Sequence, residues 1–178
     1  MPEEIQRERL TADDFHPEVL RLFDAYVHGL LDRRGFLEKA ARFVAAGSTA
    51  IGLLEALNPQ FALAEQVPKG DPRLKLESLE MDSPQGYGKV RVYAARPAKP
   101  TGKPGAVLVV HENRGLNPHI EDVARRFAVA GFNAYAPDAL APLGGYPGDE
   151  DKARELFSKL DQQKTREDFL AVAKFLKR

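Results

Sequence analysis

No cysteine occurs among the 178 residues, and neither sign of charge is in excess. The missing thiols exclude a disulfide, a thiolate metal site and a cysteine nucleophile within this chain, although they do not decide the redox compartment. Lysine plus arginine and aspartate plus glutamate both number 26, so the formal net charge is zero. A balanced charge does not indicate a nucleic-acid partner, and we expect none.

Histidine is also scarce, and none of the four histidines stands in an HExxH or H-x3-H array. A zinc site is therefore not indicated, and we expect neither a metal nor a cofactor. Long hydrophobic runs are missing too. The most apolar stretch, residues 40–57, is short and is interrupted by Arg42 and Glu55, so we expect no integral membrane span.

The length and the hydrophobic content of 43% suit one ordinary domain with an extension. We expect residues 1–65 to form a helical extension and residues 66–178 to form the domain. In the extension, residues 17–31 carry apolar side chains at helical spacing, which predicts an amphipathic helix. Pro17 suits the first turn of that helix.

The stretch after this helix resembles a twin-arginine export signal. Arg33 and Arg34 begin a match to the pattern R-R-x-F-L, and Ala62–Ala64 matches an A-x-A cleavage site. With this signal, cleavage falls after about Ala64 and the protein is periplasmic, and without it the protein is cytoplasmic. The alternative is a second amphipathic helix that folds with the first, and both interpretations stay open. The residues at helical spacing in this second helix are Phe36, Leu37, Ala40, Ala41, Val44 and Ala45.

The first half of the domain has strand patterns. Residues 74–81 and 88–96 alternate apolar and polar side chains around a turn cluster at 83–86, which predicts a β-hairpin. Residues 106–110 form a continuous apolar run. This run predicts a strand that is buried on both faces.

Helices and strands alternate in the second half. Asn117 is a good N-cap for a helix that Gly131 ends, and residues 132–136 read as a short strand. A helix follows from about Asp149, and residues 165–168 have the shape of a capping box for the last helix. A hairpin followed by strand–helix–strand–helix indicates an open α/β sheet, with a ligand crevice at the carboxyl ends of the parallel strands.

The run HENRGLN at 111–117, followed by a helix and by A-P-D at 136–138, resembles the dienelactone hydrolase family of α/β-hydrolases. The likeness covers roughly residues 74–178. It implies the N-terminal portion of an α/β-hydrolase fold: hairpin strands, then βαβα with a parallel sheet that is incomplete, preceded by two N-terminal helices. It also implies hydrolysis of an ester or lactone by a Cys–His–Asp triad, with the Cys on a G-x-C-x-G elbow after the next strand.

The resemblance assigns roles to two residues. Glu112 would lie beside the resting nucleophile and control its protonation, and Asn113 would donate its backbone N–H to the oxyanion hole. Arg114 is a candidate for pairing with Glu112 or with an acidic substrate, and a surface ion pair is the alternative that we favour. His111 is a minor substrate-binding candidate, although a packed, hydrogen-bonded residue fits its position better. Asp138 fits a turn or cap residue.

The triad itself is missing from this sequence. There is no Cys, and none of the four serines lies in a G-x-S-x-G elbow. We therefore expect residues 1–178 to be the N-terminal part of a larger hydrolase and to be inactive alone, because loss of the nucleophile typically costs several orders of magnitude in rate. The substrate would be a small ester or lactone, and a second polypeptide carrying the rest of the domain is a candidate partner.

The sequence also allows two other functions to be considered. A hydrolase remnant could act as a non-catalytic binding or interaction module. A nucleotide-binding α/β domain is disfavoured, because neither G-x-G-x-x-G nor G-x-x-x-x-G-K-[ST] follows a predicted parallel strand.

Overall fold

A computed structural model describes residues 11–44, 49–57 and 65–177 of the chain. The chain divides into two compact units, Met1–Gln60 and Phe61–Arg178, and each is described by itself. The proposed cleavage motif Ala62–Ala64 lies outside the described residues. No helix in the described ranges has the length and apolar character that crossing a membrane requires.

The N-terminal unit contains three α-helices in its described part, where the sequence predicted two. They are α1 (Pro17–Val27), α2 (Arg33–Ala40) and α3 (Ala50–Leu57). The first helix ends four residues before the predicted end. The second expected helix begins after its N-cap Asp32, whose carboxylate accepts a hydrogen bond from the Gly35 N–H at 2.7 Å.

A small aromatic core holds this unit together. Phe36 is fully buried, and its ring centroid lies 5.7 Å from that of Tyr26 and 6.2 Å from that of Phe23. Ala40 and Leu54 complete the buried cluster. The predicted helical spacing of Phe36 and Ala40 is thus confirmed, whereas the export role of Arg33 and Arg34 stays a prediction.

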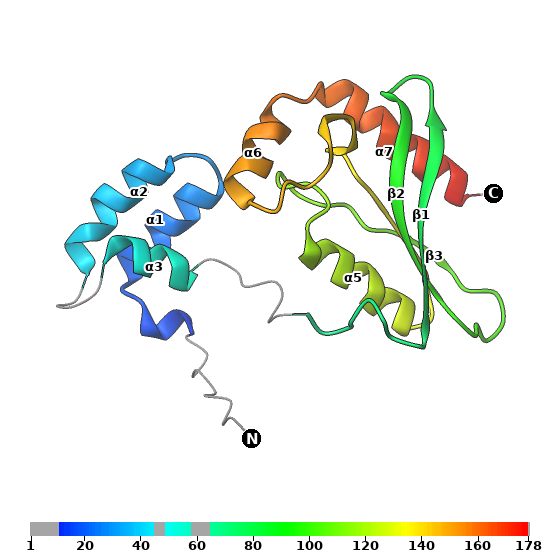
Figure 1. Ribbon diagram of the computed structural model, residues 1–178, viewed down its shortest axis with the longest axis horizontal. Coiled ribbons are helices and arrows are strands. Elements are labelled where there is room, and N and C mark those ends of the chain that lie inside the picture. Colours follow the sequence, from blue (N-terminus) through cyan, green and yellow to red (C-terminus); the bar gives the residue numbers. More distant parts are fainter. Residues whose placement is uncertain (1–10, 45–48, 58–64, 178) are drawn as a thin grey trace. The chain divides into compact units, whose positions relative to one another are not determined.

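The second unit is built on a four-stranded sheet with the order β1-β2-β4-β3. Figure 1 shows the paired strands β1 and β2 of this sheet. The strands are β1 (Leu74–Ser83), β2 (Gly88–Pro97), β3 (Ala106–Leu108) and β4 (Asn133–Pro137). The predicted hairpin is confirmed as β1 and β2, and β4 pairs with β2 antiparallel and with β3 parallel. The sheet is therefore mixed, with a single parallel pair among the described strands.

Alternate residues of the hairpin face two helices. On one face α5 (Pro118–Val129) packs through Ala124 and Ala128, small residues that let the helix approach the sheet closely. On the other face α7 (Gln162–Leu176) buries Val172 against β2. The connection from β4 to α7 carries a 3-10 turn at Ala141–Leu143 and the helix α6 (Glu150–Ser158).

Strand β3 differs from its prediction. The sequence predicted a strand at 106–110 buried on both faces, yet regular pairing covers three residues only. Ala106 is exposed, and Val110 keeps 60% of its surface accessible. The physical reason is the position of β3 at the end of the sheet, because an end strand has a neighbour on one side only.

The start of α7 was also predicted wrongly. The cap is Asp161, four residues before the expected position, and its carboxylate accepts hydrogen bonds from the N–H groups of Gln163 and Lys164 at 2.9 and 3.1 Å. Thr165 lies inside the helix, where its hydroxyl donates to the Asp161 carbonyl. An aspartate is as good an N-cap as threonine, so the local pattern offered two starts and the earlier one is used.

Candidate active site at the carboxyl ends of two strands

The segments that follow β3 and β4 meet at one edge of the sheet, as parallel pairing requires. His111 joins them, because its Nε2 accepts a hydrogen bond from the Ala139 N–H at 3.1 Å. A ring nitrogen that accepts carries no proton, so the neutral ring holds its proton on Nδ1. That Nδ1–H donates to the Glu112 carbonyl oxygen at 2.7 Å.

His111 is thereby a packed, hydrogen-bonded residue, as favoured from the sequence. It is 7% exposed and lies edge-on to the rings of Phe157 and Phe169. Burial lowers the pKa of His111, which keeps the ring neutral. Since both ring nitrogens are occupied by backbone groups, the ring is a poor general base.

A tight turn follows His111. The Gly115 N–H donates to the Glu112 carbonyl at 3.3 Å. Gly115 has φ +73°, and a Cβ there would lie 2.5 Å from Cδ1 of the buried Leu140. Only glycine combines that backbone conformation with that close approach.

The turn presents two groups of the kind that the resemblance requires. The Glu112 side chain is exposed and has no hydrogen-bond or ion-pair partner among the residues that the structure describes. The Asn113 N–H likewise has no acceptor in the described part of the chain. A carboxylate and an open N–H therefore stand side by side at the carboxyl end of β3.

Arg114 forms an ion pair, which was the favoured alternative, but the partner and the setting were not foreseen. Its Nε lies 2.7 Å from Oε2 of Glu150, and its Nη1 donates to the Asn113 side-chain oxygen at 2.9 Å. The two charged side chains are only 14% and 20% exposed. The pair therefore fastens the turn to the start of α6 and is not a solvated surface pair.

Glu150 is the residue of this site that sequence reasoning missed. Besides Arg114, its carboxylate accepts from the Tyr146 hydroxyl at 2.8 Å and from the Asn117 side-chain amide at 3.3 Å. Burial, and then Glu150 itself, raise the pKa of Tyr146. No local pattern marks Glu150, because in the sequence it is simply the first residue of a helix after the N-cap Asp149.

Asp138 is a turn residue, as predicted, and its buried carboxylate also forms an ion pair with a partly exposed arginine. Its Oδ1 accepts from the Leu140 N–H at 3.0 Å, and its Oδ2 lies 2.6 Å from Nη2 of Arg91 on β2. Gly145 packs against this pair, since a Cβ there would lie 2.3 Å from Nη2 of Arg91. The loop after β4 is therefore fixed at both of its ends.

Two sequence profiles match this chain. The profile of the dienelactone hydrolase family matches residues 90–177, and a profile described as YqhI-like matches residues 7–45. A protein of Escherichia coli (strain K12) that is named as a hydrolase fragment, YghX, is 56% identical over 113 residues, which are 64% of this chain and 97% of that protein. The chain belongs to the dienelactone hydrolase family. Membership confirms the resemblance that the HENRGLN run and the A-P-D motif carried.

Two other similar proteins extend well beyond the part that this chain matches. A protein of Methylorubrum extorquens named as a carboxymethylenebutenolidase is 36% identical over 103 residues, which are 58% of this chain and 34% of that protein. A crystal structure named as a dienelactone hydrolase of Klebsiella pneumoniae is 30% identical, with a TM-score of 0.46, over 58% of this chain and 45% of that one. The chain thus spans about a third of the first of these proteins and less than half of the second.

Proposed function

We propose that this chain supplies one part of a dienelactone-hydrolase-like active site that cleaves small esters or lactones. The observation that carries the proposal is the pair of open groups at the end of β3: the Glu112 carboxylate and the Asn113 N–H. Three anchors hold the turn that presents them: His111 on Ala139, Gly115 on Leu140, and Arg114 on Glu150. Groups held this firmly are ready for transition-state stabilisation.

The chemistry follows from the family's triad. A thiolate would attack the carbonyl carbon of the substrate, and the Asn113 N–H would donate to the oxygen that becomes negative. The alcohol leaves, water then attacks the acyl-enzyme, and the carboxylic acid and the free thiol result. Glu112 would serve by holding the proton of the resting thiol. Because this chain contains no cysteine, the nucleophile has to come from a segment outside these 178 residues.

We further infer that this segment pairs with β3. The strand lies at the end of the sheet, and Val110 just beyond it is 60% exposed. An unpaired strand edge with apolar neighbours favours addition of another strand. A second polypeptide that carries the rest of the domain would satisfy this edge and bring the nucleophile to Glu112.

The test is the hydrolysis of a p-nitrophenyl ester and of a simple lactone by the purified 178-residue chain. We expect no saturable rate above that of buffer, because a site without its nucleophile loses most of its rate enhancement. A saturable rate that co-purifies with the chain and disappears in Glu112→Gln would refute the missing nucleophile. A rate that persists unchanged in that variant would point to a contaminating esterase.

We also propose that residues 1–65 act as an extension separate from the hydrolase unit, with Arg33 and Arg34 as a twin-arginine signal. The sequence motif is the support for this proposal. The intact mass of the protein isolated from its native cells decides it. We expect the native protein to begin near Glu65, and the double variant Arg33→Lys, Arg34→Lys to remain uncleaved at its full length. An uncleaved native chain contradicts the proposal.

A further inference from the structure

A cavity of about 430 Å³ opens on the α5 side of the hairpin, beside the turn that carries Glu112. Its polar walls come from four separate parts of the second unit: the segment 65–69, both strands of the hairpin, the start of α5 and the loop 138–146. The residues that decide its chemistry are Lys69, Ser78, Arg91, Tyr93, Glu121 and Asp138. Leu116 and Pro118 add an apolar wall.

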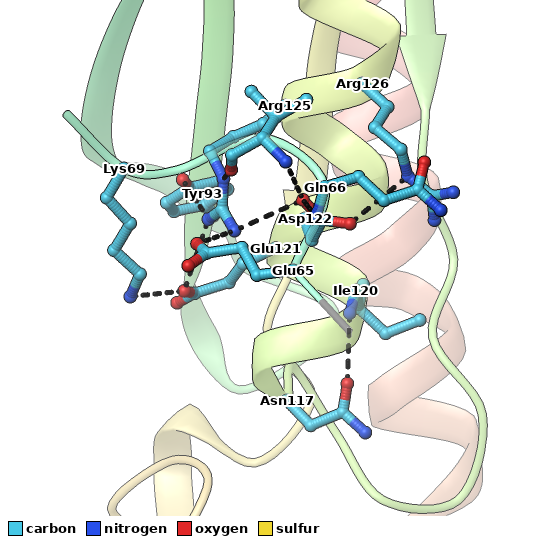
Figure 2. A network of polar contacts seen from close by, with 11 residues as sticks. Glu65, Gln66, Lys69, Tyr93, Asn117, Ile120, Glu121, Asp122, Arg125 and Arg126 are labelled. Atoms are coloured by element: carbon cyan, nitrogen blue, oxygen red, sulfur yellow. Dashed lines mark hydrogen bonds and ion pairs between the residues drawn. The ribbon is translucent and has the colours of Figure 1, made fainter. Parts of the chain in front are cut away.

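The wall that carries Lys69 is fixed by a buried network on α5 (Figure 2). The Asp122 carboxylate accepts from the N–H groups of Gln66 and Val67 at 3.2 and 2.9 Å. Arg125, only 1% exposed, donates through Nε to the Val67 carbonyl at 2.5 Å. The segment 65–69 is thereby held on the helix, and the Lys69 ammonium lies 2.5 Å from Glu121.

The floor of the cavity offers neutral donors. The Tyr93 oxygen accepts from Nη1 of Arg125 at 3.1 Å, so its own O–H points elsewhere, and no acceptor for it exists in the described ranges. Burial raises the pKa of Tyr93, which keeps this donor protonated. Ser78 lies directly across the hairpin from Tyr93, and its hydroxyl also has no partner among the described residues.

The opposite wall carries the cation Arg91, which is paired with the buried carboxylate of Asp138. Both oxygens of Asp138 are engaged, one by Arg91 and one by the Leu140 N–H, and its side chain is 2% exposed. Arg91 keeps 43% of its side chain accessible. A guanidinium has five N–H donors, and one of those of Arg91 donates to Asp138. Its other donors have no acceptor among the residues that the structure describes.

We propose that this cavity is a binding site for a small anion with a carboxylate or phosphate group. Arg91 supplies guanidinium N–H donors, and Tyr93 and Ser78 supply neutral donors. Lys69, which is paired with Glu121, adds a second cation. Leu116 and Pro118 suit a short apolar portion of the ligand. The site does not include Glu112 or Asn113 and needs no nucleophile, so it stands independently of the proposed hydrolase function.

The test is a nitrogen-15 NMR titration of the 178-residue chain with inorganic phosphate and, in a separate series, with succinate. Sodium chloride keeps the ionic strength constant. The expected result is a saturable shift of the Arg91 Nε–H and of the Tyr93 amide in at least one series, and the series that saturates at lower concentration identifies the anion. Shifts that sodium chloride alone reproduces, or no shift at these groups, overturn the proposal.

Variants separate a built site from general charge attraction. Arg91→Gln is expected to weaken anion binding about tenfold or more, the effect of losing a charge-assisted hydrogen bond. Tyr93→Phe removes the hydroxyl, together with the hydrogen bond that it accepts from Arg125, and is expected to weaken binding several-fold. Lys89→Gln is the matched control, because Lys89 is an exposed cation on the same strand outside the cavity. Equal weakening by all three variants, or no weakening by either cavity variant, contradicts the site.

Discussion

Loss of the buried Arg125 guanidinium is expected to lower the free energy of unfolding substantially. Arg125→Met keeps much of the side-chain volume but removes the hydrogen bonds to the Val67 carbonyl, the Tyr93 hydroxyl and the Glu65 carboxylate. We expect the segment 65–69 to lose its main attachment to α5. Asp122 keeps its backbone partners and Arg126, so part of the network survives.

The magnitude follows from burial. Breaking a buried ion pair by removing one partner typically costs 3–5 kcal/mol. Here the abandoned Glu65 side chain is 32% exposed and can be hydrated, whereas the Val67 carbonyl loses its partner in a buried position. The lower end of the range, about 3 kcal/mol, is therefore expected. That is a large share of the roughly 5–15 kcal/mol by which domains are stable.

Urea unfolding measures this loss. The tyrosine near-ultraviolet circular dichroism reports the α/β unit, which holds four of the five tyrosines, and hydrogen exchange at the Val67 amide reports the attachment itself. Arg126→Met is the matched control. Arg126 lies on the same helix, and its side chain is 36% exposed and pairs with Asp122, which also lies 3.6 Å from Arg125. Loss of the Arg126 guanidinium should therefore cost about 1 kcal/mol or less.

A small effect of Arg125→Met would refute this reasoning. If the free energy of unfolding falls by less than about 1 kcal/mol and the Val67 amide stays protected, the buried network does not hold the segment 65–69. If Arg126→Met costs as much as Arg125→Met, burial is not what sets the magnitude.

Three further variants test the turn at the candidate site. Gly115→Ala puts a Cβ at positive φ and 2.5 Å from Leu140, and we expect a loss of about 1–3 kcal/mol in urea unfolding; an unchanged midpoint contradicts the packing. Burial lowers the pKa of His111 in the folded state, so the unfolded chain binds the proton more readily, and stability falls as the pH drops below about 6.5. The urea midpoint should fall less between about pH 7.5 and about pH 5.5 in His111→Gln than in the unchanged protein. An equal fall in both proteins excludes His111 as the source of the pH dependence. Glu150→Gln removes the charged partner of Arg114 and should cost about 1–2 kcal/mol, with faster hydrogen exchange at Gly115; unaltered exchange means that Glu150 does not hold the turn.

The elements that the sequence predicted correctly depend on local patterns. Alternation sets the hairpin, and the side chain of Asn117 accepts from the Ile120 N–H three residues later to start α5. Both signals lie within a few residues of the structure that they specify.

The errors arise where distant parts of the chain decide. Val110 reads as a core residue but is 60% exposed, because its burial depends on a neighbouring strand. Glu150 becomes the centre of a polar network only when the loop after β4 brings α6 beside Arg114 and Asn117. Spacing in the sequence cannot show such a meeting.

The central claim, that Glu112 belongs to a hydrolase site, is tested most directly in a chimera. The chain is joined to the part of the Methylorubrum extorquens relative that lies after the region it matches, and kcat/KM for ester hydrolysis is measured. The account predicts a folded chimera that is active, and a loss of at least about tenfold in Glu112→Gln, since a proton-controlling group typically contributes more than that. Glu155→Gln, which changes an exposed glutamate on α6, should leave kcat/KM unchanged. An active chimera in which Glu112→Gln and Glu155→Gln have the same kcat/KM would contradict the claim.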